Sequence, residues 1–365
     1  MPISEKAAPS AVAATAAAAK LLPIQILRGA AAVGVVLFHS VGNSRSYTGD
    51  QENRLLHVFE NGGHGVDLFF VISGFIICCS TRASATSRGA FLRRRLERIA
   101  PIYWIFTAVM AAAALLVPSL FSNASDVLGL RAVSSFLFAS FLGDTTPIIY
   151  VGWSLELEMF FYLVVALLLH PSERMWSQIV YLFSILTILH VAPFTKTLGV
   201  VHGFFTQPRL LEFAYGVLAA LIVARRPVAK PFAVAALATL TVSADDDAGS
   251  LIGAGLPAAL LVLLAAFWSE RDRRPTAVER LCGRIGDASY SIYLVQVFVI
   301  SAVGKTVSRL HASIDILILV ETGLSILAGY AVFRLLEQPL LAALRSFRSK
   351  KSNARDDEAR PERVA

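Results

Sequence analysis

Long apolar segments, separated by short polar stretches, recur along almost the whole chain. A helix that crosses the hydrocarbon core of a bilayer needs about 20 mostly apolar residues, and these segments approach or reach that length. They cover residues 22–41, 65–81, 101–120, 133–149, 154–169, 178–193, 208–224, 229–243, 251–268, 287–304 and 313–336. The pattern predicts an all-α, polytopic membrane protein.

Basic residues gather between the apolar segments, and their distribution decides how many segments cross the membrane. Short loops that carry clusters of Lys and Arg face the cytoplasm. The clusters lie within residues 88–98, 225–230, 271–284 and 345–351. All four share one side only if residues 133–149, a short segment that ends in Gly, Asp and Pro, do not fully cross. We therefore expect about ten transmembrane helices, both termini cytoplasmic, and one extra re-entrant or surface helix.

The overall composition agrees with this architecture. Hydrophobic residues make up 56% and charged residues only 16% of the 365 positions, whereas soluble proteins contain about 25% charged residues. The net charge of +7 does not indicate a nucleic-acid partner, because the basic residues lie in short clusters between the segments. The three cysteines show neither metal-ligand spacing nor a disulfide framework, so no metal site is expected.

Three regions are expected along the chain. Residues 1–20 form a flexible, Ala-rich N-terminal segment, residues 21–342 form the transmembrane domain, and residues 343–365 form a basic, disordered cytoplasmic tail. The first apolar segment is long and contains Arg28, which favours an uncleaved membrane span over a signal peptide.

Two ionisable residues, Arg28 and His39, lie inside the first apolar segment. A charge near the centre of a bilayer costs at least about 2.5 kcal/mol, so such residues are candidates for function. Their spacing places both on nearly the same helix face, about 16 Å apart along the axis. The alternative is structural: Arg28 anchors the helix at the membrane surface, and His39 forms a hydrogen bond that packs two helices.

The basic stretch FLRRRLERIAPIYW contains Arg95 and Arg98, which share one face of a helix. Two guanidinium groups on one face can bind a diphosphate through bidentate hydrogen bonds. The alternative is that this run only fixes the topology. Pro101 is expected to open the third helix, where its missing N–H does no harm.

The segment GGHGVDLFFVISGFII places Asp67 at the mouth of a helix and puts Ser73 and Gly74 inside an apolar span. Asp67 can orient a histidine or cap the N-terminus of the helix. Small residues within a span usually indicate close helix packing, and we favour that interpretation here. A Ser73 hydroxyl that faces a binding site is the alternative.

The stretch GWSLELEMFFYL predicts a polar stripe on one helix face, because Ser154, Glu158 and Tyr162 follow one another at intervals of four residues. The helix dipole favours carboxylates in the first turn, which explains one of Glu156 and Glu158 structurally. The other indicates a polar pocket beside Trp153, unless Trp153 belongs to the aromatic belt at the membrane interface.

Two local ion pairs are expected in the remaining motifs. Arg209 and Glu212 lie three residues apart in QPRLLEFAYG, and Arg334 and Glu337 lie three apart in RLLEQP. Pro339, which follows the second pair, is expected to stop the last helix.

Taken in order, these motifs resemble those of the membrane-bound acyltransferase-3 family over about residues 24–340. The resemblance rests on Arg28 with ten residues before His39, GVDLFFVISGFI, the Arg95-x-x-Arg98 pair, WSLELEMFFY, RLLEFAYG, GDASYSIYL and the closing EQP. The second span, which contains Asp67, and the loop after it look most like the branch that O-acetylates bacterial exopolysaccharides.

The resemblance implies a core of ten helices, an acyl-CoA donor (commonly acetyl-CoA) taken from the cytoplasm, and a carbohydrate or other hydroxyl-bearing acceptor. It also implies essential roles for Arg28 and His39. Many relatives have a histidine where this chain has Gln296. A glutamine side chain hydrogen-bonds but cannot shuttle a proton, so no second catalytic histidine is assumed.

Together these expectations describe an O-acetyltransferase of the bacterial inner membrane. His39 is the expected general base, or is transiently acetylated, with Glu158 or, second, Asp67 as its carboxylate partner. The expected acyl-CoA-binding residues are Arg28, Ser73, Arg95 and Arg98. The expected acceptor-binding residues are Trp153, Tyr162 and Gln296.

The expected partners are acyl-CoA, a polysaccharide or lipid-linked oligosaccharide acceptor, and membrane lipids, with no bound cofactor. A homo-oligomer or a polysaccharide-synthesis complex is a further option. The alternative function is a transporter or exporter of acyl groups or polysaccharide precursors that has no transfer chemistry of its own. Such a transporter is expected to show repeated halves with broken helices, and the sequence shows none.

Overall fold

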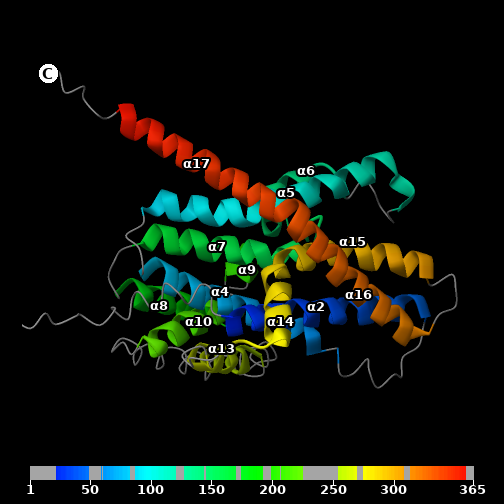
Figure 1. Ribbon diagram of the computed structural model, residues 1–365, viewed down its shortest axis with the longest axis horizontal. Helices are drawn as coiled ribbons and strands as arrows, with labels where there is room; N and C mark the ends of the chain where they lie inside the picture. Colours follow the sequence, from blue (N-terminus) through cyan, green and yellow to red (C-terminus); the bar gives the residue numbers. More distant parts are fainter. Residues whose placement is uncertain are drawn as a thin grey trace, which may run out of the picture.

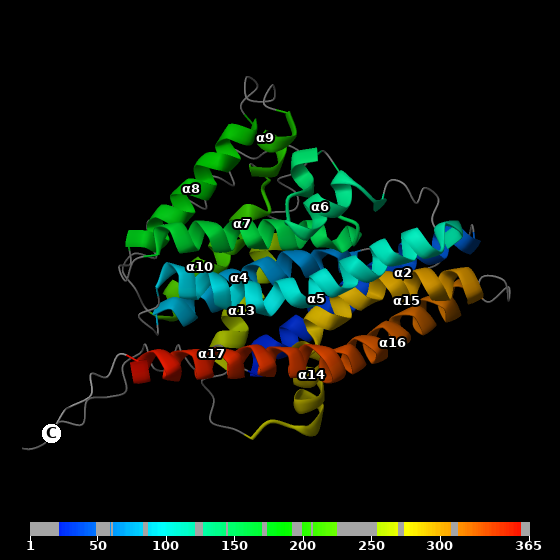
Figure 2. The same ribbon diagram turned by 90° about the horizontal axis from the view of Figure 1, so that it is seen from above.

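The computed structural model describes residues 22–48, 59, 61–82, 87–120, 127–143, 145–169, 174–191, 199–205, 207–224, 254–268, 274–307 and 313–358. These residues form helices and no strand, which confirms the predicted all-α class. The five long helices named next run side by side along the long axis of the molecule (Figure 1 and Figure 2). They are α2 (Leu22–Thr48), α4 (Gly65–Arg82), α5 (Arg88–Leu116), α7 (Trp153–Leu168) and α15 (Ser289–Val307).

Five helical stretches in the described residues are long and apolar enough to cross a membrane. They are Leu22–Ser46, Asn61–Thr81, Arg88–Leu116, Tyr150–Leu168 and Ile314–Arg348. A sixth arises if α14 (Ala277–Asp287) and α15, which meet at an angle of 66°, form one broken span. The chain is therefore a membrane protein with several apolar helices. The predicted span 229–243 and the N-terminal segment 1–20 lie outside the described residues.

Five further helices in the described part of the chain lie in or beside other apolar segments. They are α6 (Leu130–Phe136), α8 (Arg174–Val191), α9 (Gly199–Phe205), α10 (Leu210–Val223) and α13 (Leu256–Trp268). The predicted segment 133–149 contains only the end of the seven-residue α6, a 3-10 turn at Ser140–Gly143 and irregular backbone in its described part. The described residues of that segment contain no long helix, and whether it crosses the membrane stays a prediction.

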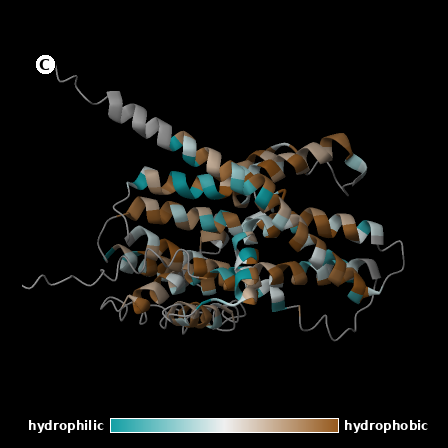
Figure 3. Ribbon diagram, viewed as in Figure 1, coloured by the Kyte–Doolittle hydropathy of each residue, from teal (hydrophilic) through white to brown (hydrophobic). Residues whose placement is uncertain are grey.

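The third long helix begins well before Pro101. α5 starts at Arg88, and the hydroxyl oxygen of Ser87 caps it by accepting a hydrogen bond from the N–H of Ala90 at 3.3 Å. The residues between are mostly Leu, Arg, Glu and Ala, which have high helix propensity, so one proline does not end the helix. Pro101 thus lies inside α5, and the expectation that it opens the helix is wrong. Figure 3 shows the hydrophilic first half of α5 and its hydrophobic second half.

The last apolar helix does not stop at Pro339. α16 (Ile314–Val332) continues through a π-helical turn (Phe333–Glu337) into α17 (Gln338–Glu358). In a regular α-helix the proline ring would collide with the carbonyl group four residues earlier, and the wider π turn lies at that place. The expected stop is therefore wrong, and the helix extends into the region expected to be a flexible tail.

Glu337, on this π turn, has a different partner from the one expected. Its Oε2 atom accepts a hydrogen bond from the hydroxyl of Ser291 on α15 at 2.5 Å. Within the described residues no ion pair joins Glu337 to Arg334, because the carboxylate points into the bundle toward α15.

The α4 and α10 backbones touch at two glycines. A Cβ atom on Gly74 would collide with the carbonyl oxygen of Phe213, and one on Gly216 would collide with the carbonyl oxygen of Val71. The helices can approach this closely only because neither position has a side chain. Gly74 therefore fits the packing interpretation of the small residues in α4.

Gly74→Ala is expected to destabilise the protein by about 1–3 kcal/mol, the usual cost of overpacking a tight contact. Gly323→Ala on α16 is the matched control, because nothing lies within 4 Å of its Cβ position. Thermal unfolding of both purified variants in the same detergent measures the difference. Equal midpoints would show that α4 and α10 do not meet as closely as the structure shows.

Candidate active site

A cavity of about 90 Å³ lies among α2, α4, α5, α7 and α15. We call it the arginine cavity. Six of the residues selected from the sequence line it, and they come from four different helices. They are Arg28, Ser73, Arg95, Arg98, Glu158 and Tyr162.

The charged side chains that line the arginine cavity are three arginines and one glutamate. Arg28 donates one hydrogen bond, from Nη1 to Oε1 of Gln25 at 3.1 Å. A guanidinium group has five N–H donors, so most of them stay available for a ligand. A site with this excess of positive charge favours an anion, and paired guanidinium groups suit phosphate oxygens in particular.

Arg95 is held in place from three sides. Its Nη2 donates to the hydroxyl of Ser80 at 2.8 Å. The guanidinium carbon lies 5.4 Å from the ring centroid of Phe91 and 5.8 Å from that of Tyr162, within the range of cation–π attraction. These contacts fix the direction of the side chain, so the guanidinium group is preorganised for a ligand.

Glu158 is the acidic residue that lines the arginine cavity. Its Oε1 accepts a hydrogen bond from the hydroxyl of Ser73 at 2.8 Å and another from the hydroxyl of Tyr162 at 2.5 Å. The predicted stripe on α7 is thus present, and Ser154 at its start also lines the cavity. The Ser73 hydroxyl faces the cavity, whereas the neighbouring Gly74 contacts α10.

His39 lies in a different cavity, of about 310 Å³, which we call the histidine pocket. The imidazole is packed edge-on between two rings, with centroids 5.1 Å from Phe38 and 5.0 Å from Tyr150. It makes no hydrogen bond to any described residue. Both ring nitrogens are therefore available to a substrate.

A short 3-10 turn, Tyr150–Gly152, links the two cavities. Tyr150 lines the histidine pocket, and the next carbonyl, that of Val151, accepts a hydrogen bond from the hydroxyl of Tyr293 at 2.9 Å. Tyr293 lines the arginine cavity and its oxygen lies 2.7 Å from that of Ser154. The two cavities therefore share one hydrogen-bonded wall.

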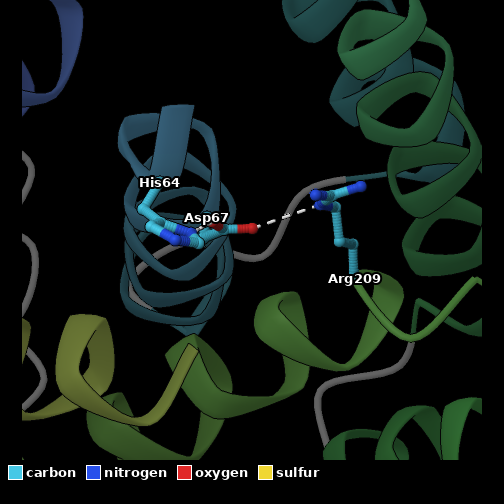
Figure 4. A network of polar contacts seen from close by, with 3 residues as sticks. All are labelled: His64, Asp67 and Arg209. Carbon is cyan, nitrogen blue, oxygen red and sulfur yellow. Dashed lines mark hydrogen bonds and ion pairs between the residues drawn. The ribbon is translucent and has the colours of Figure 1, made fainter. Parts of the chain in front are cut away.

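A separate polar cluster surrounds the buried carboxylate of Asp67 (Figure 4). Its Oδ2 lies 2.8 Å from Nδ1 of His64, and its Oδ1 accepts from Nε of Arg209 at 3.3 Å. Arg209 also places its guanidinium carbon 5.4 Å from the centroid of the Trp153 ring. The expected ion pair of Arg209 with Glu212 is thus replaced by a pair with Asp67, which belongs to a distant part of the sequence.

Neither Glu158 nor Asp67 contacts His39 in the described part of the chain, although both were selected as its carboxylate partners. Their hydrogen bonds go instead to Ser73 and Tyr162, and to His64 and Arg209. The imidazole of His39 is held by ring contacts alone.

The residues expected to bind the acceptor do not lie together. Tyr162 lines the arginine cavity, and Trp153 lines a third cavity of about 440 Å³ with Glu156. Gln296 is fully buried and donates from Nε2 to the backbone carbonyl of Tyr293 at 3.1 Å. It lines none of these three cavities.

Several lining residues were not selected from the sequence. Asn43 lies in the histidine pocket, and Tyr290 and Tyr293 line the arginine cavity. Asn43 follows His39 by four positions, so helical periodicity could have found it. Both tyrosines belong to the GDASYSIYL motif, but which of its side chains face a cavity depends on how α15 is rotated.

A family model that describes the acyltransferase domain matches residues 23–335. The chain belongs to the acyltransferase-3 family. The exopolysaccharide production protein ExoZ of Rhizobium meliloti (strain 1021) is 34% identical over 301 residues, which cover 78% of this chain and 91% of that protein. The acyltransferase MdmB of Streptomyces mycarofaciens is 27% identical over 358 residues, covering 87% and 91%. No solved structure matches significantly. The protein is an acyltransferase, and the cavities are its candidate active site.

Arg209→Gln is expected to destabilise the protein by about 1–3 kcal/mol, because the buried carboxylate of Asp67 loses its guanidinium partner. Arg93→Gln is the control, since Arg93 and Glu97 form an exposed pair at 3.6 Å whose loss costs about 0–1 kcal/mol. Thermal unfolding compares the two variants. A loss no larger than that of Arg93→Gln would mean that Asp67 does not need Arg209.

Proposed function

We propose that the protein is an integral-membrane O-acetyltransferase of the bacterial inner membrane. It moves the acetyl group of acetyl-CoA to a hydroxyl of an exopolysaccharide or lipid-linked carbohydrate. The observation that carries this proposal is the arginine cavity, which three arginines and one glutamate line together. The printed name of the relative ExoZ, an exopolysaccharide production protein, supports the acceptor class.

The donor is a substrate, and its phosphates bind at Arg28, Arg95 and Arg98. Phosphate oxygens, like those of a carboxylate, match the planar fork of a guanidinium group and accept two parallel hydrogen bonds from it. Ser73 lines the same cavity, next to Glu158, and helps to orient the pantetheine arm. Binding through the phosphates is distant from the reacting thioester, so it contributes mainly to affinity for the donor.

In the proposed topology ten helices cross the membrane and both termini are cytoplasmic. Glu97 on α5 and Arg348 on α17 form an ion pair at 3.4 Å. This contact supports a topology in which the basic start of α5 and the C-terminal helix lie on the same side of the membrane. Figure 1 shows both at the same end of the molecule. That end is the cytoplasmic one in the proposal, since both segments are rich in arginine.

The proposed chemistry is a direct transfer of the acetyl group. His39 accepts the proton of the acceptor hydroxyl while the hydroxyl oxygen forms a bond to the thioester carbonyl carbon. The carbon–sulfur bond then breaks, and the leaving CoA thiolate takes the proton from the imidazolium to become free CoA. General-base assistance of this kind increases a rate by about 10²–10⁴-fold.

Glu158 and Asp67 act as positioning residues in this proposal. Glu158 fixes the hydroxyls of Ser73 and Tyr162 on the wall that faces the arginines. Asp67 ties α4 to Arg209, and Arg209 lies against Trp153. We assign acceptor contacts to Trp153 in the third cavity and to Tyr162 in the arginine cavity, with Gln296 supporting the backbone of Tyr293 from within the bundle.

The double substitution Arg95→Gln/Arg98→Gln is expected to raise the KM for acetyl-CoA by at least about tenfold, because each lost charged hydrogen bond weakens donor binding. The KM for the acceptor is expected to stay near its wild-type value. Steady-state kinetics of the purified enzyme with radiolabelled acetyl-CoA give both constants.

The matched control is Arg93→Gln/Arg94→Gln, which removes the same charge from the same helix at positions that do not line the cavity. If the two double variants behave alike, the arginines only fix the topology and the donor site lies elsewhere.

His39→Gln is expected to reduce transfer by about 10²–10⁴-fold while acetyl-CoA binding stays close to that of the wild type. Glutamine keeps a hydrogen-bonding group and much of the shape, but it cannot accept and return a proton. Turnover and equilibrium donor binding are measured on the same preparation. An active His39→Gln enzyme would assign His39 to helix packing and move the search for the base to the His64–Asp67 pair.

A further inference from the structure

Asn43 lies one helical turn after His39 on α2, and both side chains line the histidine pocket. Residues four positions apart on a helix have Cβ atoms about 5–6 Å apart. A ligand that reaches the imidazole of His39 therefore also comes within reach of the Asn43 amide.

Two acceptors fix the orientation of that amide. Nδ2 of Asn43 donates to Oε1 of Glu321 on α16 at 2.6 Å and to the backbone carbonyl of Ile300 on α15 at 3.3 Å. A primary amide has two N–H groups, so both are used. A flipped amide would bring its carbonyl oxygen against two other oxygens. Oδ1 is the group left for a ligand, and no described residue donates to it.

Glu321 explains why the amide does not flip. It is fully buried in α16, among residues that are mostly apolar. Together with the backbone carbonyl of Ile300, which can only accept a hydrogen bond, its Oε1 atom holds the N–H side of Asn43. A neutral amide at the same position could present either an oxygen or a nitrogen. Burial of a carboxylate is costly, and here the result is one defined orientation of a side chain in the pocket.

We propose that Asn43, oriented by Glu321, accepts a hydrogen bond from a second hydroxyl of the acceptor sugar while His39 engages the hydroxyl that is acetylated. A sugar ring presents several hydroxyls at fixed spacing. Two simultaneous contacts therefore select which hydroxyl faces the imidazole. Asn43 is a specificity-determining residue and Glu321 a positioning residue. This inference rests on the proposed function, because it takes a carbohydrate as the acceptor.

The aromatic ring of Tyr150 forms the other side of the same pocket, with its centroid 5.0 Å from that of His39. A pocket with an aromatic wall and a few directed polar groups is the usual form of a small-molecule site. Here the directed groups are the Oδ1 atom of Asn43 and the unprotonated nitrogen of the neutral imidazole, and both can accept a hydrogen bond from a hydroxyl.

The test uses the full-length protein in lipid nanodiscs, with radiolabelled acetyl-CoA as donor. The acceptor probe is exopolysaccharide of the source bacterium from which mild alkali has removed the acyl groups. Asn43→Ala and Glu321→Leu are expected to raise the KM for this polysaccharide about tenfold, the order of one lost hydrogen bond, with kcat and donor KM near wild type. NMR of the product is expected to show acetyl groups at more than one ring position.

Two further variants isolate the role of Glu321. Glu321→Gln keeps an oxygen that can accept from Asn43, so it is expected to restore most of the acceptor affinity. The double variant Asn43→Ala/Glu321→Leu is expected to be no worse than Asn43→Ala alone, because the two residues act as one unit. Fully additive effects would contradict the positioning role.

Ser46→Ala is the matched control on α2, because its exposed hydroxyl bonds the backbone carbonyl of Asn43 at 2.6 Å and does not line the pocket. It is expected to match the wild type. An unchanged acceptor KM and a single acetylated position in Asn43→Ala would overturn the inference, even if Glu321→Leu fails to fold. A wild-type enzyme that transfers no acetyl group to the polysaccharide would instead refute the proposed function itself.

Discussion

Carboxylates inside the bundle, most of them buried, hold it in register by accepting hydrogen bonds from neighbouring segments. Apolar surfaces give membrane helices little preference for one rotation over another, because lipid tails are as apolar as the side chains. Directed polar contacts supply that preference. Four such carboxylates each accept a hydrogen bond from another part of the fold: Glu158 from Ser73, Asp67 from Arg209, Glu321 from Asn43, and Glu337 from Ser291.

The same contacts determine where the cavities lie. Because α7 is tied to α4 through Glu158, the arginines of α2 and α5 face a wall of hydroxyls. Because α16 is tied to α2 through Asn43, a second cavity remains beside His39. The hydrogen bond from Tyr293 to the carbonyl of Val151 joins the two. Packing and chemistry thus depend on one set of side chains.

Local patterns in the sequence predict much of this arrangement. Apolar length predicts the helices, and a spacing of four residues predicts the stripe of Ser154, Glu158 and Tyr162, since both depend only on neighbours along the chain. The same reasoning selected Arg28, Arg95 and Arg98, which the fold brings into one cavity.

Partners from distant segments could not be predicted in this way. Local spacing favoured Glu212 as the partner of Arg209, but the rotation of α10 against α4 brings Asp67 closer. Local rules likewise placed Pro101 and Pro339 at helix ends. In the structure, residues of high helix propensity before Pro101 and a π turn before Pro339 keep both prolines inside helical segments. A carboxylate partner was predicted for His39 because a general base is often oriented by one. In the fold, aromatic rings pack against its imidazole instead.

The π turn before Pro339 also determines how long the last helical segment of the chain is. It joins α16 and α17 into one helical rod from Ile314 to Glu358. At 1.5 Å per residue such a rod is about 67 Å long, roughly twice the 30 Å thickness of the hydrocarbon core. Even at a tilt of about 40°, the upper end of the usual range, the rod spans about 51 Å along the membrane normal, so roughly 20 Å of it lies beyond the lipid tails. Arg345 and Arg348, which follow the π turn on α17, therefore reach the depth of the phosphate headgroups.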